Sequence, residues 1–158
     1  MSNLFKLSES PDDDEKTQNA RADDARYRLI ASVMSDYVFS VQYGPEREIA
    51  GQWISGAFEA ITGYTPQEYF DRGGWLSILH PDDGEQGRLV LTQLGANQRM
   101  VTEVRIIRKD GKVRWVRVYA HPAWDEKEDR LSGAYGAVQD ITERKRAEAE
   151  LQQREAIL

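Results

Sequence analysis

Alternation of apolar and polar residues predicts three consecutive strands between Met100 and Thr142. An Asp110-Gly111 pair separates the first two runs, and an Asp-Gly pair between alternating runs is typical of a tight hairpin turn. The charged stretch 125–130 separates the second run from the third. The pattern therefore predicts an antiparallel meander that leads directly into a C-terminal helix. The three predicted strands are 101–109, 113–124 and 131–139.

The N-terminal half predicts one helix and two more strands. Residues 19–35 repeat apolar side chains at helical spacing, with Leu29 and Val33 on the apolar stripe. Residues 37–43 alternate with a period of two, which is typical of a strand with two unlike faces. After a turn, residues 49–55 form a second short predicted strand.

Between the two groups of strands, the sequence predicts short helices with readable starts. We expect Ser55 to cap a helix that Gly63 ends in the left-handed conformation. The stretch 65–68 has the sequence of a capping box with proline at the first helical position. Asp82, which follows His80-Pro81, is expected to cap the next, longer helix. Two strands, several helices and three strands together predict an α+β fold with an antiparallel sheet.

The two ends of the chain differ from this middle part. The first residues are acidic and poor in apolar side chains, which predicts disorder. The polar C-terminal helix carries a weak heptad seam at Arg144, Leu151 and Leu158, so we expect a truncated coiled coil in a fragment of a longer protein. The predicted organisation is a disordered tail over 1–18, a cap helix over 19–35, a domain over 36–142 and a linker helix over 143–158.

Composition narrows the classes of function. The chain has 158 residues, 40% apolar and 30% charged, with a formal net charge of −6 that argues against a nucleic-acid partner. It contains no cysteine and two histidines, which leaves few nucleophile and base pairs, and no phosphate-binding loop or metal-ligand motif appears. No long apolar run suggests a signal peptide or a membrane span. We therefore expect a cytoplasmic, non-catalytic protein without a metal site.

Four motifs in order resemble those of PAS domains. They are Phe58–Glu68 (Phe-Glu-Ala-Ile-Thr-Gly-Tyr-Thr-Pro-Gln-Glu), His80-Pro81-Asp82-Asp83, Arg108–Val116 at the hairpin, and Asp140–Lys145 at the exit of the last strand. The hairpin and exit motifs resemble the C-terminal PAC part of such domains. The resemblance implies a five-stranded antiparallel sheet of order 2-1-5-4-3 with short helices on one face.

The same resemblance implies a sensory and dimerisation module. Such modules pass a small-molecule, redox or light signal through the exit helix to an effector in the same chain, here expected to be a histidine kinase or a cyclic-dinucleotide enzyme. A purely structural dimerisation domain without a ligand is the alternative.

A ligand pocket is expected between the inner face of the sheet and the short helices. The alternative is a filled core, because apolar spacing alone does not distinguish packed side chains from a cavity. The expected walls are Ile54, Phe58, Ile61, Trp75, Leu79, Val104, Ile106, Val116, Val118 and Val138.

No cofactor is identified by the sequence. Light-oxygen-voltage domains need a cysteine for their flavin adduct, and the position that resembles their flavin-contacting glutamine is Val138. A non-covalent flavin or a haem sensor remains an alternative. Haem requires an axial ligand, whereas His80 and His121 are expected to be structural.

The alternation of side chains between the two faces of the sheet predicts two further sites, a dimer interface and a signal exit. Trp115 and Tyr119 share the sheet face opposite the apolar one, and with Leu29 and Val33 they are the expected interface of a parallel homodimer. A half-solvated sheet face is the alternative.

The expected signal exit consists of Asp140, Thr142 and Arg114. An antiparallel hairpin brings the end of the last strand beside the start of the preceding one, so Asp140 is expected to approach Arg114, with Arg117 as the second candidate. A simple helix cap is the alternative role for Asp140.

Overall fold

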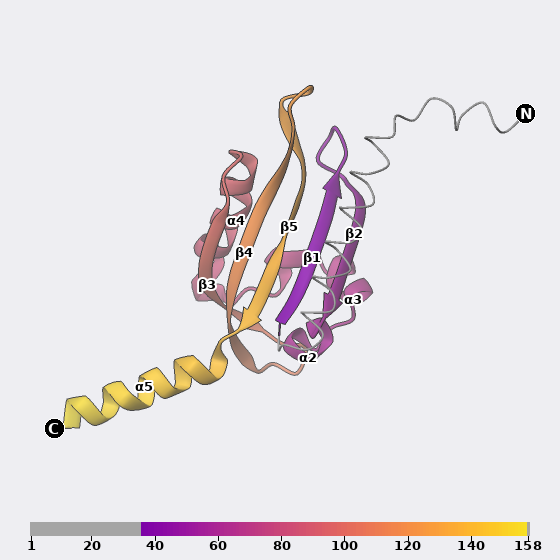
Figure 1. Ribbon diagram of the computed structural model, residues 1–158. Helices are drawn as coiled ribbons and strands as arrows, with labels where there is room; N and C mark the ends of the chain where they lie inside the picture. The colour runs from indigo at the N-terminus through magenta and orange to yellow at the C-terminus, as the bar shows by residue number, and fades with distance from the viewer. Residues whose placement is uncertain (1–35, 158) are drawn as a thin grey trace, which may run out of the picture.

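A computed structural model of the protein describes residues 36–157. The predicted tail and cap helix over 1–35, with Leu29 and Val33, lie outside the described residues. The predicted five-stranded antiparallel sheet with strand order β2-β1-β5-β4-β3 is confirmed (Figure 1). Its strands are β1 (Asp36–Tyr43), β2 (Ile49–Gly56), β3 (Met100–Ile107), β4 (Val113–Asp125) and β5 (Arg130–Asp140).

The two faces of the sheet follow the alternation of the sequence. Val104 of β3 pairs with Val116 of β4, and Val118 of β4 pairs with Val138 of β5, and all four side chains are buried on the inner face. Tyr135 of β5 is exposed on the outer face. Because successive side chains point to opposite sides of a strand, one period-two pattern specifies both faces.

The short helices cover the inner face, as predicted (Figure 1). The capping box at the start of α3 is confirmed: the Thr65 hydroxyl accepts from the Glu68 amide, and the Glu68 carboxylate accepts from the Thr65 amide. Gly63 ends α2 with a φ of 77°, in the left-handed region that costs glycine least. The helical segments are α2 (Phe58–Thr62), α3 (Pro66–Asp71), η2 (Gly74–Ser77), η3 (Pro81–Asp83) and α4 (Gly84–Gly95).

Two predicted helix caps are wrong. Ser55 lies within β2, the residue before α2 is Ala57, and the Ser55 hydroxyl is enclosed without a hydrogen-bond partner among the described residues. Asp82 does not cap a helix either, because the His80 ring accepts from the Asp82 amide and a 3-10 turn forms before α4. The strand β2 continues past Ser55 to Gly56, and the 3-10 turn Pro81–Asp83 contains Asp82, so neither residue stands at the start of a helix.

Close packing fills the space between α4 and the β3 side of the sheet. A Cβ at Gly87 of α4 would lie 2.1 Å from Leu79 Cδ1, so the glycine lets Leu79 approach the helix. Leu79 also bridges to Ile106 of β3. No open space is therefore left between the inward-facing side chains of β3 and α4.

The C-terminal helix α5 (Thr142–Ile157) begins two residues after the end of β5 and projects away from the sheet (Figure 1). Ile141 and Thr142 are buried, and most later residues of α5 are exposed. Only the first turn of α5 is thus in a position to respond to the sheet.

Candidate functional site

A pocket of about 310 Å³ lies between the inner sheet face and the helices. Its floor comes from β1, β2, β4 and β5, and its cover comes from α3, η2 and α4. The wall is largely apolar and aromatic, as is typical of small-molecule sites. The lining residues are Tyr37, Phe39, Val41, Tyr43, Ile49, Ile54, Tyr69, Phe70, Gly73, Gly74, Trp75, Leu76, Val90, Leu91, Leu94, Val118, Ala120, Ala134 and Val138.

The pocket lies nearer to β1 than the sequence indicated. Among the expected wall residues, Ile54, Trp75, Val118 and Val138 line the pocket. The others do not line it, because they belong to the packed core beneath β3, the adjoining part of β4 and α2. These other residues are Phe58, Ile61, Leu79, Val104, Ile106 and Val116.

Sequence reasoning missed the tyrosines of the pocket. Tyr37, Tyr43 and Tyr69 all line it. The rings of Tyr37, Phe58 and Tyr69 form an edge-to-face series with centroids 5.0 and 5.1 Å apart. The alternation of β1 already placed Tyr37 and Tyr43 on one face, and this signal could have identified two of the three.

The lining fits a flavin poorly. None of the described residues that line the pocket is charged, so a flavin phosphate would have no cation inside it. Val138 is 2% exposed and offers only methyl groups to the pocket. Neither histidine lines the pocket: His80 accepts from the Asp82 amide, and His121 stacks on Tyr135 at 5.3 Å.

The start of α5 is fixed by two hydrogen bonds to β4 and one to the end of β5. The Ile141 amide donates to the Trp115 carbonyl at 2.9 Å, and the Trp115 amide donates to Thr142 Oγ1 at 3.0 Å. The Thr142 hydroxyl donates to Asp140 Oδ1 at 2.6 Å, which orders the carboxylate as well. A movement of β4 or β5 at this end would therefore reach the first turn of α5.

Asp140 lies near Arg114, the cation that the alternation of side chains along the strands predicted. Its Oδ2 is 3.7 Å from Arg114 Nη1, whereas Arg117 pairs with Glu103. Asp140 also faces the first residue of β1: burial and then the nearby Asp140 carboxylate raise the pKa of Asp36. The end of β5 thus combines one ion pair with one repulsion between carboxylates.

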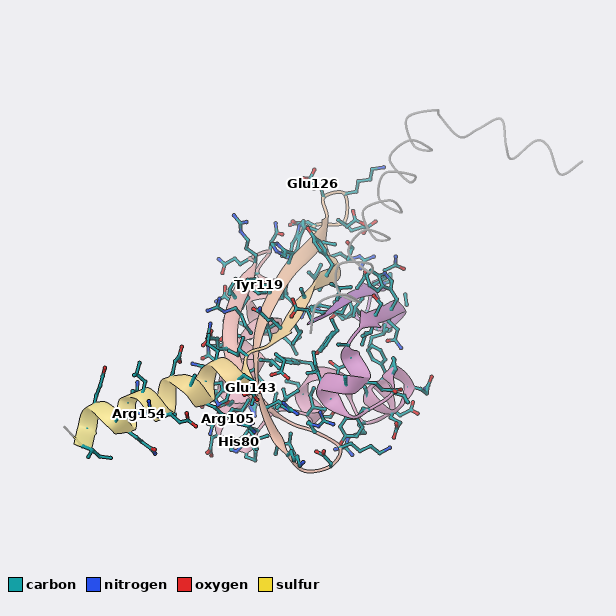
Figure 2. All side chains as sticks on the ribbon, turned by 60° about the horizontal axis from the view of Figure 1, so that its bottom comes forward. His80, Arg105, Tyr119, Glu126, Glu143 and Arg154 are labelled. Atoms are coloured by element: carbon teal, nitrogen blue, oxygen red, sulfur yellow. The ribbon has the colours of Figure 1, made fainter. Side chains whose placement is uncertain are left out.

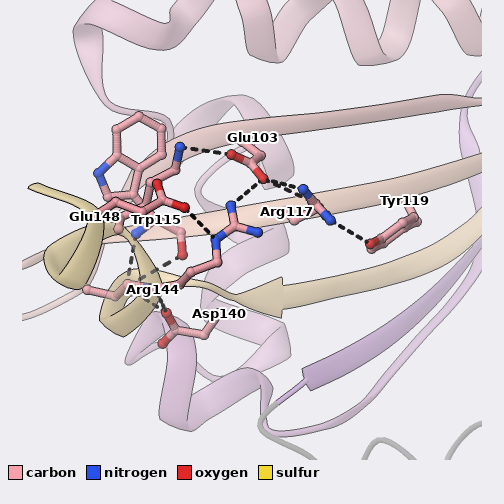
Figure 3. Close-up of polar contacts among 9 residues, drawn as sticks. Glu103, Trp115, Arg117, Tyr119, Asp140, Arg144 and Glu148 are labelled. Atoms are coloured by element: carbon pink, nitrogen blue, oxygen red, sulfur yellow. Dashed lines mark hydrogen bonds and ion pairs between the residues drawn. The ribbon is translucent and has the colours of Figure 1, made fainter. Parts of the chain in front are cut away.

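Glu103 is the residue that the sequence analysis missed at this junction. Its Oε2 accepts from Arg117 Nη2 at 2.7 Å and from Arg144 Nη2 at 2.6 Å, while Oε1 lies 2.9 Å from Lys145 Nζ (Figure 3). Hydrogen bonds from Lys145, Arg144 and Arg117 lower the pKa of Glu103 to about 2. Strand parity placed Glu103 and Arg117 on one face, and the basic pair Arg144-Lys145 after the exit motif could have indicated its partners.

Trp115 links this junction to the beginning of α4. The Arg105 guanidinium lies 5.3 Å from the centre of its ring, and the Lys145 ammonium lies 4.8 Å from it. Arg105 in turn donates to both carboxylate oxygens of Asp83, with Nη2 2.7 Å from Oδ1. The side chain expected at a dimer interface therefore also contacts the exit helix within its own chain.

Tyr119, the other described residue of the expected dimer interface, lies on the same outer face (Figure 2). Its hydroxyl accepts from Arg117 at 3.4 Å. Tyr135, in the neighbouring strand, is 50% exposed and stacks on His121. The outer face thus presents a row of half-covered aromatic rings.

Neither a metal site nor a membrane span is found in the part of the chain that the structure describes. No cluster of three or more potential metal ligands occurs within residues 36–157. None of the helices in that range is both long enough and apolar enough to cross a bilayer.

Comparisons with known proteins agree with this architecture. The family model of the PAS fold matches residues 53–135, more than half of the chain. No curated protein sequence matches the chain.

Several solved structures are similar. A sensory box histidine kinase/response regulator from Burkholderia thailandensis E264 is 26% identical, with a TM-score of 0.64, covering 84% of this chain and 97% of that one. The N-terminal domain of a diguanylate cyclase with a PAS/PAC sensor from Marinobacter aquaeolei is 18% identical, with a TM-score of 0.58 and coverages of 70% and 98%. A LOV protein from Rhodobacter sphaeroides is 16% identical, with a TM-score of 0.53 and coverages of 77% and 68%.

Proposed function

Because the chain belongs to the PAS family, we propose that it is a cytoplasmic sensory and dimerisation module without a catalytic role of its own. In this proposal, a small molecule in the pocket is the input, and α5 relays its presence to an effector domain in the same protein. A histidine kinase or a diguanylate cyclase is the effector class that we favour, because two similar structures come from proteins with those names.

The observation that carries the proposal is a continuous set of contacts from the pocket to α5. Val138 lines the pocket, and Asp140, two residues further along β5, holds the Thr142 hydroxyl at the start of α5. We assign Asp140, Thr142 and Arg114 to the signal exit, with Glu103 as an added member. A ligand that displaces β5 would change the geometry of every one of these contacts.

A second set of contacts connects α4 with the same point. Val90 and Leu94 of α4 line the pocket, and Asp83, directly before this helix, holds Arg105 against Trp115. Lys145 covers the ring of Trp115 from α5. Both the floor and the cover of the pocket therefore contact the junction, so either can bias the position of α5.

The relay is tested by filling the pocket with a larger side chain. Ala134→Leu adds methyl groups from β5 into the pocket that Ala134 lines. Ala137→Leu makes the same change on the opposite face of the strand and is the matched control. Hydrogen exchange of the Ile141 and Trp115 amides, followed by NMR, reports on the junction.

We expect Ala134→Leu to change the exchange rates of these two amides by about fivefold or more, because coupling free energies between sites are commonly about 1–3 kcal/mol. Ala137→Leu should leave both rates within about twofold of the wild type. If both rates stay unchanged in a folded Ala134→Leu protein, occupancy of the pocket is not relayed to α5.

A further inference from the structure

The polar groups of the pocket are almost entirely phenols. Tyr37 and Tyr69 are 3% and 7% exposed, and Tyr43 is partly buried. Among the described residues, neither Tyr37 nor Tyr69 has a hydrogen-bond partner for its hydroxyl. A buried hydroxyl without a partner costs about 1–3 kcal/mol, which favours a ligand that supplies one.

The two unpartnered hydroxyls reach open space. Within residues 36–157, the polar side-chain atoms that are both enclosed and unpaired are Ser55 Oγ and Arg108 Nε. The phenol oxygens of Tyr37 and Tyr69 are not among these sealed atoms, and both side chains line the pocket. Both groups can donate to a molecule in it.

The surroundings keep these groups neutral. Burial raises the pKa of Tyr37, Tyr43 and Tyr69. The nearby Tyr69 adds to the shift of Tyr37 and the nearby Tyr43 adds to that of Tyr69, whereas Arg47 opposes the shift of Tyr43. No charged side chain lines the pocket among the described residues. The phenols are consequently donors to an acceptor, and a carboxylate or phosphate inside the pocket would remain without a counter-charge.

The rim of the pocket is also apolar. Ile49, Leu76 and Leu91 are 53%, 46% and 39% exposed, although each lines the pocket. Gly73 and Gly74 beside Leu76 have φ values of 113° and 72°, a conformation that glycine adopts at little cost. A molecule entering past these residues meets hydrocarbon before it meets the tyrosines.

We propose that the pocket binds an uncharged, mostly apolar molecule that carries a carbonyl-type hydrogen-bond acceptor, such as an aromatic ketone, ester or amide. The acceptor lies against Tyr37 and Tyr69, and the hydrocarbon part lies against the strands and the apolar rim. The size is that of a small bicyclic compound, because a pocket of about 310 Å³ is at the lower end of the range for small-molecule sites. This inference rests on the proposed function, in which the pocket is the sensing site.

Three matched probes test the proposal on the full chain: 2-acetylnaphthalene, 2-methylnaphthalene and 2-naphthoate. They share one ring system and differ in carrying a neutral acceptor, no acceptor or an anion. Binding is measured by calorimetry and by shifts in the NMR spectrum, for the wild type and for Tyr37→Phe and Tyr69→Phe. Tyr135→Phe, outside the pocket, is the control.

In the wild type, the ketone should bind at least about threefold more tightly than the hydrocarbon and at least about tenfold more tightly than the carboxylate. Each pocket substitution should weaken the ketone about three- to tenfold and leave the hydrocarbon within about twofold. Tyr135→Phe should change neither affinity.

Equal binding of ketone and hydrocarbon, tightest binding of the carboxylate, or no effect of either pocket substitution would overturn the assigned ligand class. Because at least one probe would still bind in each of these cases, a pocket for sensing would stand. If no probe binds, the inference fails, and the Ala134→Leu exchange experiment decides separately whether the relay stands.

Discussion

At the scale of single residues, Glu103 holds the junction together because one carboxylate accepts from three cations. Arg117 comes from the neighbouring strand, while Arg144 and Lys145 come from α5. The Glu103 side chain is 23% exposed, so solvent screens these pairs only in part. Hydrogen bonds from these three cations lower the pKa of Glu103.

Glu103→Gln should lower the free energy of unfolding at pH 7 by about 1–2 kcal/mol after allowance for screening. The folded-state pKa lies below the ordinary value of 4.5, so ionised Glu103 stabilises the fold above that pH, and the contribution is lost as the pH falls towards about 2. The difference between wild type and variant should therefore narrow below pH 4.5. Urea unfolding at several pH values measures it.

Glu126→Gln provides the control for charge alone. Glu126 is exposed in the β4–β5 loop, at the opposite end of the hairpin from Glu143 in the first turn of α5 (Figure 2). This variant should follow the wild type within about 0.5 kcal/mol at each pH. A Glu103→Gln curve that also follows the wild type would show that the three pairs contribute nothing to stability.

At the scale of elements, the central strand β5 depends on a glycine. Gly136 pairs with Phe39 of β1 and with Ala120 of β4. A Cβ at this position would lie 1.8 Å from the Tyr119 carbonyl oxygen, which belongs to the backbone of β4. The neighbouring strand has to shift to accept any side chain here.

Gly136→Ala should therefore lower the free energy of unfolding by about 2–3 kcal/mol, in the upper part of the range for overpacking. Gly51→Ala, in the edge strand β2, is the matched control: its Cβ would lie 2.8 Å from Gln42 Oε1, the mobile end of a side chain. We expect a loss of less than about 1 kcal/mol there. Equal losses in urea unfolding would show that the close approach at Gly136 is relieved without cost.

The elements themselves were largely readable from the sequence because each depends on local patterns. Alternation specified the strands, and the Thr65 capping box and Gly63 specified the helix ends. Ser55 was misread because a serine near a predicted helix start fits the end of a strand equally well.

The position of the pocket could not be read in the same way. The burial of side chains under β3 depends on how closely α4 approaches the sheet. That approach depends on the contact between Gly87 and Leu79, two residues that are separated in sequence. Partners of Glu103 were missed for a similar reason, because α5 returns Arg144 and Lys145 to a strand about 40 residues earlier.

At the scale of the whole molecule, we expect a parallel homodimer that uses the outer face of the sheet. The face presents Tyr119, Tyr135 and His121, and aromatic residues of this kind are enriched at interfaces. Trp115 contributes less surface than the sequence indicated, because Lys145 and Arg105 cover its ring.

Tyr135→Glu should weaken the dimer about tenfold or more, because truncated aromatic anchors at interfaces commonly cost more than 1 kcal/mol. Leu89→Glu is the control, since Leu89 is 41% exposed on α4, away from the outer face. Sedimentation equilibrium measures both dissociation constants. A wild type that stays monomeric at high micromolar concentration would contradict the expectation.

The polar attachment of α5 determines which surface is exposed when the helix detaches from the sheet. Beside the hydrogen bonds at Ile141 and Thr142, its first turn is held by the pairs of Arg144 and Lys145 with Glu103, and water solvates these charged groups well once they separate. Detachment therefore uncovers little apolar surface beyond Ile141 and one side of Trp115, so the released form has little tendency to aggregate. A higher salt concentration screens the pairs of Arg144 and Lys145 with Glu103 and therefore favours detachment of the helix.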